Sequence, residues 1–196
     1  PGVIVNVVDA TNLERNLYLT AQLLELERPM VVALNFMDEV EKRGDRIDCG
    51  LLSRILKVPV VSIVARTGHN VEELLTLAHR QVHVGVTLEP DDLYDEYTHE
   101  IHHDVSELIH DAAYAARIPA HWASIKLIEG DKLVEEALGL PPETRAMVDQ
   151  IAARYENAYD VGDRETLIAD SRYRFIQGVV AQAVEKGSPY GTLTVS

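Results

Sequence analysis

The stretch that decides the fold is residues 30–38, which read Met-Val-Val-Ala-Leu-Asn-Phe-Met-Asp. An unbroken apolar run that contains adjacent valines is typical of a strand buried on both faces of a parallel sheet. The apolar run ends at Asn35, and Asp38 follows three positions later. The stretch therefore predicts a buried strand over 30–34 that leads into a loop with the pattern Asn-x-x-Asp.

Apolar runs and helical patterns alternate on both sides of this strand. Strands are expected at 3–8 and 58–63, and helices at 13–26, 47–56 and 71–83. Alternation at this spacing predicts parallel strands joined by right-handed crossovers. The fold class expected for residues 1–86 is therefore α/β.

Residues 87–196 have a different character. They carry −12 of the net charge of −14, and they contain no convincing strand pattern. The expected helices are 93–117, 122–128, 132–138, 143–155 and 164–186. The Gly- and Pro-containing stretch 83–92 is the expected linker. The sequence thus predicts an all-α helical domain after an α/β domain.

Composition excludes several classes of protein. A net charge of −14 repels phosphate backbones, so no nucleic-acid partner is expected. The single cysteine, Cys49, suits a reducing compartment, and no apolar run is long enough to cross a bilayer. The chain starts at Pro1 and not at Met, so we expect a piece of a longer protein.

Two loops after expected strands carry the chemistry of guanine recognition. Ligands of open α/β sheets bind beyond the carboxyl ends of the strands. Asp38 can accept two hydrogen bonds at once, from N1–H and the exocyclic amino group of guanine, and adenine offers no such pair of donors. Asn35 can bridge the base and the loop Val64-Ala65-Arg66-Thr67-Gly68 that follows the next strand. Asn-x-x-Asp alone is also common in ordinary turns.

The sequence resembles the cytosolic GTPase region of the ferrous iron transport protein B (FeoB) family. The resemblance begins with Val7-Val8-Asp9-Ala10-Thr11-Asn12-Leu13-Glu14-Arg15-Asn16 and continues through Val32-Ala33-Leu34-Asn35-Phe36-Met37-Asp38. It extends into the helical half through Lys126-Leu127-Ile128-Glu129-Gly130-Asp131 and 168–173. It implies the C-terminal half only of a Ras-like P-loop NTPase sheet over 1–86. A helical regulatory (GDI-like) domain would span 87–190, and 191–196 would lead toward the membrane spans.

The resemblance also implies roles for individual residues. Asn35 and Asp38 match the guanine-specificity motif, and Met37 stands where many GTPases have Lys. Ala65 and Arg66 match a second loop that contacts the base, although Val64 replaces a common Ser. The implied ligands are GTP and GDP, with Mg²⁺ in the intact parent.

The phosphate-binding motif G-x-x-x-x-G-K-S/T does not occur in these 196 residues. This chain alone is therefore not expected to hydrolyse GTP, although the resemblance implies a parent that hydrolyses it slowly and regulates Fe²⁺ uptake. The parent would be an integral membrane protein with this region at the cytoplasmic face. Expected partners are the other half of the G domain, the transmembrane domain and, through the exposed edge of strand 3–8, a second copy.

A zinc-binding signature supports an alternative to guanine-nucleotide binding. His99-Glu100-Ile101-His102-His103 satisfies H-E-x-x-H, which places His99 and His103 on one helical face with Glu100 as a general base. His110 is expected one further turn along the same face, and Asp104 or Glu107 could add an oxygen ligand. The alternative hypotheses are that this chain is a metallopeptidase or that it holds an adventitious metal site. The simplest interpretation of the pattern is a solvated His-rich helix without a metal.

Overall fold

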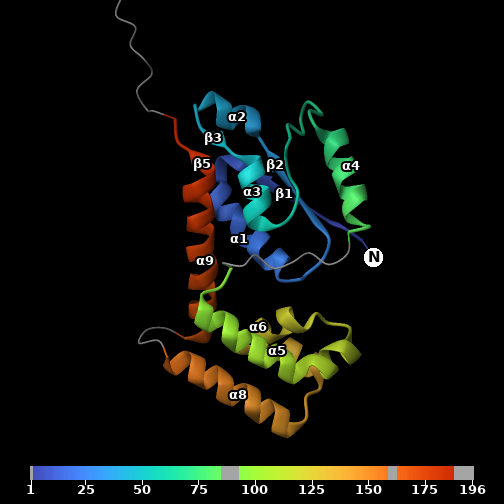
Figure 1. Cartoon of the computed structure of the whole chain (residues 1–196), viewed down its shortest axis with the longest axis vertical. Coiled ribbons are helices and arrows are strands. Elements are labelled where there is room, and N and C mark those ends of the chain that lie inside the picture. The colour runs from blue at the N-terminus through green and yellow to red at the C-terminus, as the bar shows by residue number, and fades with distance from the viewer. Residues whose placement is uncertain (1, 85–92, 159–162, 188–196) are drawn as a thin grey trace, which may run out of the picture. The chain divides into compact units, whose positions relative to one another are not determined.

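The computed structural model describes residues 2–84, 93–158 and 163–187, which form two compact units (Figure 1). The first unit comprises Pro1–Thr20, Arg28–Pro90 and Ile176–Ser196, and the second comprises Ala21–Glu27 and Asp91–Phe175. The expected domain boundary after residue 86 and the expected tail 191–196 lie outside the described residues. None of the helices in the described ranges is both long and apolar enough to cross a membrane.

A parallel sheet forms the core of the first unit. Its strands β1 (Ile4–Asp9), β2 (Met30–Asn35) and β4 (Val60–Ser62) lie in the order β1-β2-β4. The central strand β2 is buried at all residues except Asn35. The predicted buried strand and the α/β fold class are therefore confirmed.

Helices connect these strands. The first unit contains η1 (Ala10–Asn12), the start of α1 (Leu13–Leu24), α2 (Met37–Lys42), α3 (Cys49–Leu56) and α4 (Val71–Gln81). Leu74 and Ala78 of α4 pack on Val31, Ala33 and Val61 of the sheet. Helix α4 thus covers β2 and β4 on this face, whereas Val5 and Val7 of β1 remain exposed.

A second, two-stranded sheet corrects the sequence prediction. Strand β3 (Arg46–Ile47) pairs in antiparallel fashion with β5 (Val184–Glu185). The helix expected over 47–56 begins only at Cys49, because the side chain of Asp48 caps it by accepting from Leu51 N–H at 2.8 Å. The helix expected over 164–186 ends at Ala183, and strand β5 follows it. The prediction that residues 87–196 contain no strand was therefore wrong.

The second unit is helical, as predicted. It contains α5 (Glu96–Ala116), α6 (Ala120–Glu129), α7 (Lys132–Leu138), α8 (Pro142–Asn157) and the first part of α9 (Arg164–Ala183). Residues in the left-handed region end three of these helices, namely Arg117, Gly130 and Gly139. Helix α5 buries Ile101, Val105, Ile109 and Ala113 at four-residue spacing, the periodicity of a core-facing helix.

A buried ionic network lies inside the second unit. Arg172 of α9 donates from Nε to Glu25 Oε1 at 2.6 Å and from Nη2 to Glu25 Oε2 at 3.0 Å. Its Nη1 donates to Glu129 Oε1 at 2.7 Å, and Tyr94 donates to Glu25 Oε1 at 2.6 Å. The network joins the residue that follows α1 to α6 and α9.

Candidate functional site

The strand-to-helix turn after β2 positions Asn35, Met37 and Asp38. Asn35 is the last residue of β2, and Phe36 adopts a left-handed conformation with φ of 65°. The Phe36 carbonyl accepts from Glu39 N–H at 3.0 Å and from Val40 N–H at 3.2 Å, which starts α2. Asn-x-x-Asp is therefore a sharp turn with Met37 and Asp38 in the first turn of a helix, and not the loop expected from the sequence.

The loop after β4 is closed by its own hydrogen bonds. Val64 N–H donates to the His69 carbonyl at 3.3 Å, and Thr67 N–H donates to the Val64 carbonyl at 3.0 Å. The positive φ of Gly68, 76°, allows the chain to turn back toward α4. Ala65 N–H is the exception, because it points out of the loop to Asn35 Oδ1 at 3.0 Å. This hydrogen bond ties the two candidate loops together.

Asp38 lies between two cations and faces solvent. Its Oδ2 is 3.4 Å from Lys42 Nζ and 3.6 Å from Arg66 Nη2. The Asp38 side chain is 29% exposed, and both cations are largely exposed. Exposed pairs of this length contribute at most about 1 kcal/mol, so a ligand with two N–H donors can replace them.

The structure brings all five predicted nucleotide-site residues to one edge of the sheet. Asn35, Met37 and Asp38 come from the β2–α2 turn, and Ala65 and Arg66 come from the loop after β4. Asn35 contacts Ala65, and Asp38 contacts Arg66. The sequence did not predict that Arg66 contributes a side-chain cation beside Asp38.

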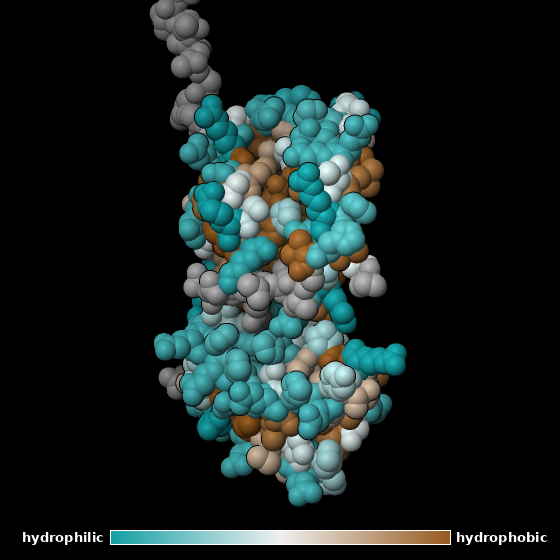
Figure 2. Space-filling view, turned by 45° about the vertical axis from the view of Figure 1, so that its right-hand side comes forward, coloured by the Kyte–Doolittle hydropathy of each residue, from teal (hydrophilic) through white to brown (hydrophobic). Residues whose placement is uncertain are grey.

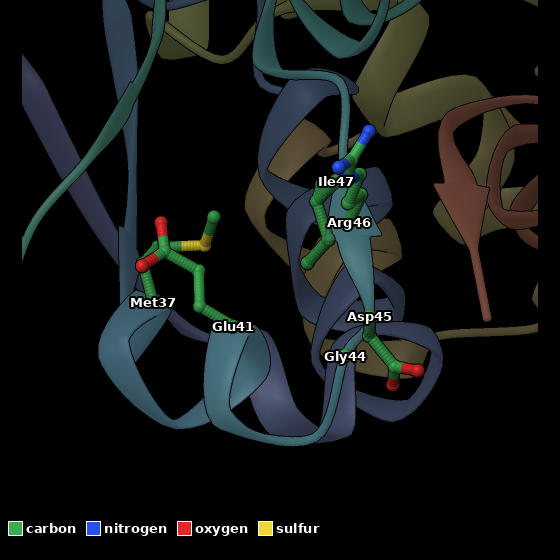
Figure 3. A pocket seen from close by; sticks show the side chains of 6 residues that line it. All are labelled: Met37, Glu41, Gly44, Asp45, Arg46 and Ile47. Atoms are coloured by element: carbon green, nitrogen blue, oxygen red, sulfur yellow. The ribbon is translucent and has the colours of Figure 1, made fainter. Parts of the chain in front are cut away.

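A hollow that sequence reasoning missed lies on another side of α2. It has a volume of about 570 Å³ and is lined by Met37, Glu41 and residues 44–47. Figure 3 shows the Met37 side chain of α2 reaching toward Ile47 of β3 across this space, with the Glu41 carboxylate beside Met37. All of its lining residues lie within 37–47, but no residue pattern in this stretch indicates a hollow.

Polar side chains of the loop after β1 form hydrogen bonds within the loop itself. Asp9 accepts from Thr11 Oγ1 at 2.7 Å, from Thr11 N–H at 2.9 Å and from Asn12 Nδ2 at 2.9 Å. The Thr11 side chain, followed by Asn12, lowers the pKa of Asp9. The carboxylate therefore caps η1.

The zinc alternative is not favoured. His99 and His103 do share a face of α5, with ring centroids 5.9 Å apart. Within 2–84, 93–158 and 163–187, however, no group of three or more His, Cys, Asp or Glu residues is arranged to hold a metal ion. His103 Nδ1 lies 3.8 Å from Glu107 Oε1, and His110 lies beside Asp111 at 3.3 Å.

His102, between these residues, makes the second unit sensitive to acid. Burial, followed by the charges of His99, His121 and His103, lowers the pKa of His102 to about 3. The other groups that face it are Tyr94 and, beside His121, Glu27. The folded state binds fewer protons than the unfolded state between about pH 3 and pH 6.5. This contribution to stability is therefore complete above pH 6.5 and is lost as the pH falls.

We expect the free energy of unfolding to fall by about 1.4 kcal/mol per pH unit from about pH 6 to pH 5 through this one group. His102→Leu should flatten the slope, whereas His110→Gln, at an exposed position of the same helix, should not. Urea titrations followed by circular dichroism at a series of pH values measure the slope. An equal slope in wild type and His102→Leu would contradict the assignment.

The sheet, the joined loops at its edge and the separate helical unit define a Ras-like G domain followed by a helical domain. Sequence comparison agrees, because the family described as ferrous iron transport protein B matches residues 1–78 and the FeoB cytosolic helical domain matches residues 94–185. The chain belongs to the FeoB family.

Individual relatives give the extent of the match. The Fe(2+) transport protein A/FeoB fusion protein of Porphyromonas gingivalis is 36% identical over 93% of this chain, and the Fe(2+) transporter FeoB of Escherichia coli is 34% identical over 90%. The chain spans 22% of the length of each.

Solved structures match as well. An NFeoB mutant from S. thermophilus bound to GDP is 33% identical, with a TM-score of 0.84 over 94% of this chain and 69% of its own. NFeoB bound to GDP, AlF4⁻ and K⁺ is 32% identical, with a TM-score of 0.79 over 89% of this chain and 67% of its own.

Proposed function

We propose that this chain is the guanine-recognition part of a G domain, with its helical domain, from a ferrous iron transporter. The observation that carries the proposal is the hydrogen bond from Ala65 N–H to Asn35 Oδ1, which assembles the two loops with Asp38 beside them. The GDP bound in the S. thermophilus relatives supports the same ligand class.

Each residue of the site has a chemical role in this proposal. Asp38 accepts from guanine N1–H and from the exocyclic amino group, in place of its present partners Lys42 and Arg66. Asn35 holds the second loop through Ala65, and the backbone N–H of Arg66 donates to guanine O6. Met37 packs its thioether chain against the base, without the charge of a Lys.

Hydrolysis is not assigned to this chain. The residues that cradle phosphates and hold Mg²⁺ in P-loop enzymes are a Gly-rich loop with Lys-Ser/Thr, and these 196 residues do not contain that motif. The residues present therefore do not fit a Mg²⁺ site of the P-loop type. We propose that this chain binds guanine nucleotide without hydrolysing it.

The wider role follows from the family. We propose that the chain acts at the cytoplasmic face of the membrane, as part of a transporter whose GTP-bound state and slow hydrolysis regulate the uptake of its cargo, Fe²⁺. In this proposal residues 1–86 form the nucleotide domain and 87–190 form a regulatory domain that slows GDP release. Residues 191–196 lead toward the membrane spans.

An NMR titration of the 196-residue chain with GDP, with ADP as the control, tests the proposal. Because these 196 residues lack the P-loop motif that binds the phosphates, we expect GDP to bind weakly, mainly through its base. Amide shifts should appear at Asn35, Asp38 and Arg66 with GDP and be absent with ADP. Equal shifts with both nucleotides, or none with either, would overturn the assignment of these residues.

We also propose that the edge of the sheet at β1 pairs with another strand, either of a further part of the G domain or of a second copy of this chain. Val5 is 40% exposed and Val7 is 56% exposed on this edge strand. Figure 2 shows further apolar side chains reaching the surface of the sheet-containing unit. An apolar edge strand with unpaired backbone groups favours strand addition.

Val7→Lys is expected to suppress self-association, because edge lysines block strand pairing. Light scattering during size-exclusion chromatography should show a concentration-dependent dimer for the wild type and a monomer for Val7→Lys. Leu75→Lys, at an exposed position of α4, is the matched control and should still dimerise. A wild-type chain that remains monomeric at all concentrations would contradict pairing between copies.

A further inference from the structure

Residues 44–48 and 183–187 form a set of contacts that we call the clasp. Arg46 and Ile47 pair with Glu185 and Val184 as β3 and β5. Asp48 N–H donates to the Ala183 carbonyl at 2.9 Å on one side of this pairing. On the other side, Gly187 N–H donates to Asp45 Oδ1 at 2.8 Å. The clasp therefore holds the chain that leaves α9 against the chain that leaves α2.

Two glycines make the clasp sterically specific. Gly44 adopts a φ of 79°, a conformation that side chains rarely tolerate. A Cβ atom on Gly187 would lie 2.7 Å from the carbonyl carbon and oxygen of Gly44, and 2.9 Å from the carbonyl oxygen of Arg43. All three are backbone atoms that cannot rotate away. Only glycine at 187 permits this approach.

The clasp is continuous with the end of α2. Gly44 N–H donates to the Glu41 carbonyl at 2.9 Å, and Asp45 N–H donates to the Val40 carbonyl at 3.2 Å. Asp45 thus terminates α2 with its backbone while its carboxylate holds Gly187. The Gly187 N–H lowers the pKa of Asp45, so this acceptor is charged at neutral pH.

Helix α2 needs such a support. It has six residues, fewer than an isolated helix needs to be stable in water. One side of it borders the hollow between Met37, Glu41 and Ile47 (Figure 3), so packing there is incomplete. Its first turn carries Met37 and Asp38, and its last turn runs directly into the clasp.

We propose that Asp45 and Gly187 are positioning residues for guanine recognition, which hold α2 so that Asp38 and Met37 are correctly placed for the base. This inference rests on the proposed binding of guanine nucleotide. It assigns a role in base recognition to a contact that includes residues nearly 150 positions after Asp38 in the sequence.

Gly187→Ala in the 196-residue chain tests the proposal, with Gly178→Ala as the matched control. Gly178 lies in α9, where an added Cβ meets nothing within 4 Å. Amide hydrogen exchange by NMR reports on the clasp through Asp48 N–H and on α2 through Glu39 and Val40 N–H. We expect Gly187→Ala to accelerate exchange at all three and to weaken GDP binding about tenfold. Gly178→Ala should change neither.

Asp45 provides a second pair of variants. Asp45→Ala removes the acceptor of Gly187 N–H and should reproduce the effects of Gly187→Ala. Asp45→Asn keeps an acceptor oxygen and should restore both exchange protection and affinity, which a general loss of stability would not do.

The outcomes separate this inference from the proposed function. Fast exchange at Asp48 with unchanged exchange at Glu39 and Val40 would overturn the inference, as would protection of Asp48 in both Gly187→Ala and Asp45→Ala. If the wild-type chain binds no guanine nucleotide, the proposed function fails. The exchange rates in α2 then still decide whether the clasp positions this helix.

Discussion

Asp38→Asn is expected to abolish the preference of this chain for GDP over ADP. The carboxylate of Asp38 is the only proposed group that accepts two hydrogen bonds from guanine, and hydrogen bonds to a charged acceptor contribute about 1.5–3 kcal/mol each. Their loss should weaken GDP binding by about 100-fold or more, so that Asp38→Asn should show as little response to GDP as to ADP. The NMR titration with both nucleotides measures the ratio.

The same substitution should create a new specificity. Xanthine has a carbonyl where guanine has its exocyclic amino group. An Asn at position 38 can accept from N1–H and donate to this carbonyl, which the Asp cannot do. Asp38→Asn should therefore bind xanthosine diphosphate more tightly than the wild type does. A gain of binding cannot result from partial unfolding.

Two further variants complete the experiment. Asp38→Ala should lose GDP and gain nothing, because it offers neither acceptor nor donor. Glu39→Gln removes a negative charge from the neighbouring exposed position of the same helical turn and should leave the ratio of GDP to ADP affinity unchanged. An unaltered ratio in Asp38→Asn would show that Asp38 does not read the base.

The sequence predicted those parts of the site that depend on local pattern. The run 30–34 identified β2 because five consecutive apolar residues need burial on both faces, and the position of Asn35 at the strand end followed from it. The parallel order of strands then indicated that residues 64–68 would lie near Asn35, as the Ala65 contact shows. Helices with clear stop signals, such as α7 before Gly139, had the predicted bounds.

Long-range contacts could not be predicted in this way. Strands β3 and β5 have two residues each and lie far apart in the sequence, so neither has a recognisable period. The left-handed Phe36, which makes the Asn-x-x-Asp turn sharp, has a side chain that usually avoids this conformation. The H-E-x-x-H pattern has the converse limit: helical spacing places two ligands, but only the tertiary fold can supply a third, and the described part of the chain brings none to them.

Arg172→Met is expected to destabilise the helical unit by about 3–5 kcal/mol, the range for removing one partner of a buried ion pair. Arg172 and Glu25 are each 2% exposed. Burial alone would lower the pKa of Arg172, but the hydrogen bonds and charge of Glu25 raise it above its ordinary value. Without the guanidinium, Glu25 would remain buried without this cation, whereas Glu129 would keep its ion pair with Lys126 Nζ at 2.6 Å.

Urea denaturation followed by circular dichroism measures this loss, and Arg174→Ala is the control. Arg174 lies two positions away on α9 and contacts Asp95 Oδ2 at 2.6 Å, but it is 58% exposed. Its removal should cost at most about 1 kcal/mol. A loss below about 1 kcal/mol for Arg172→Met would contradict the assignment of the network as a major source of stability.

Two further variants distinguish the contribution of the Arg172 charge from that of its hydrogen-bond geometry. Arg172→Lys keeps the charge and has three N–H donors, but its single nitrogen cannot reproduce the planar fork that bonds both oxygens of Glu25 and reaches Glu129, so it should recover only part of the loss. Combining Arg172→Met with Glu25→Gln removes both buried charges of the closest pair and should be more stable than Arg172→Met alone.

The network also determines which part of the chain the helical unit needs. Glu25 belongs to the segment Ala21–Glu27, which lies in the same compact unit as Asp91–Phe175 although it is distant in sequence. A chain that begins at Asp91 would therefore contain Arg172 without its principal partner. We expect this shorter chain to be less stable than the helical unit of the full chain by about the amount that Arg172→Met costs, because each change leaves one side of the same buried pair unsatisfied.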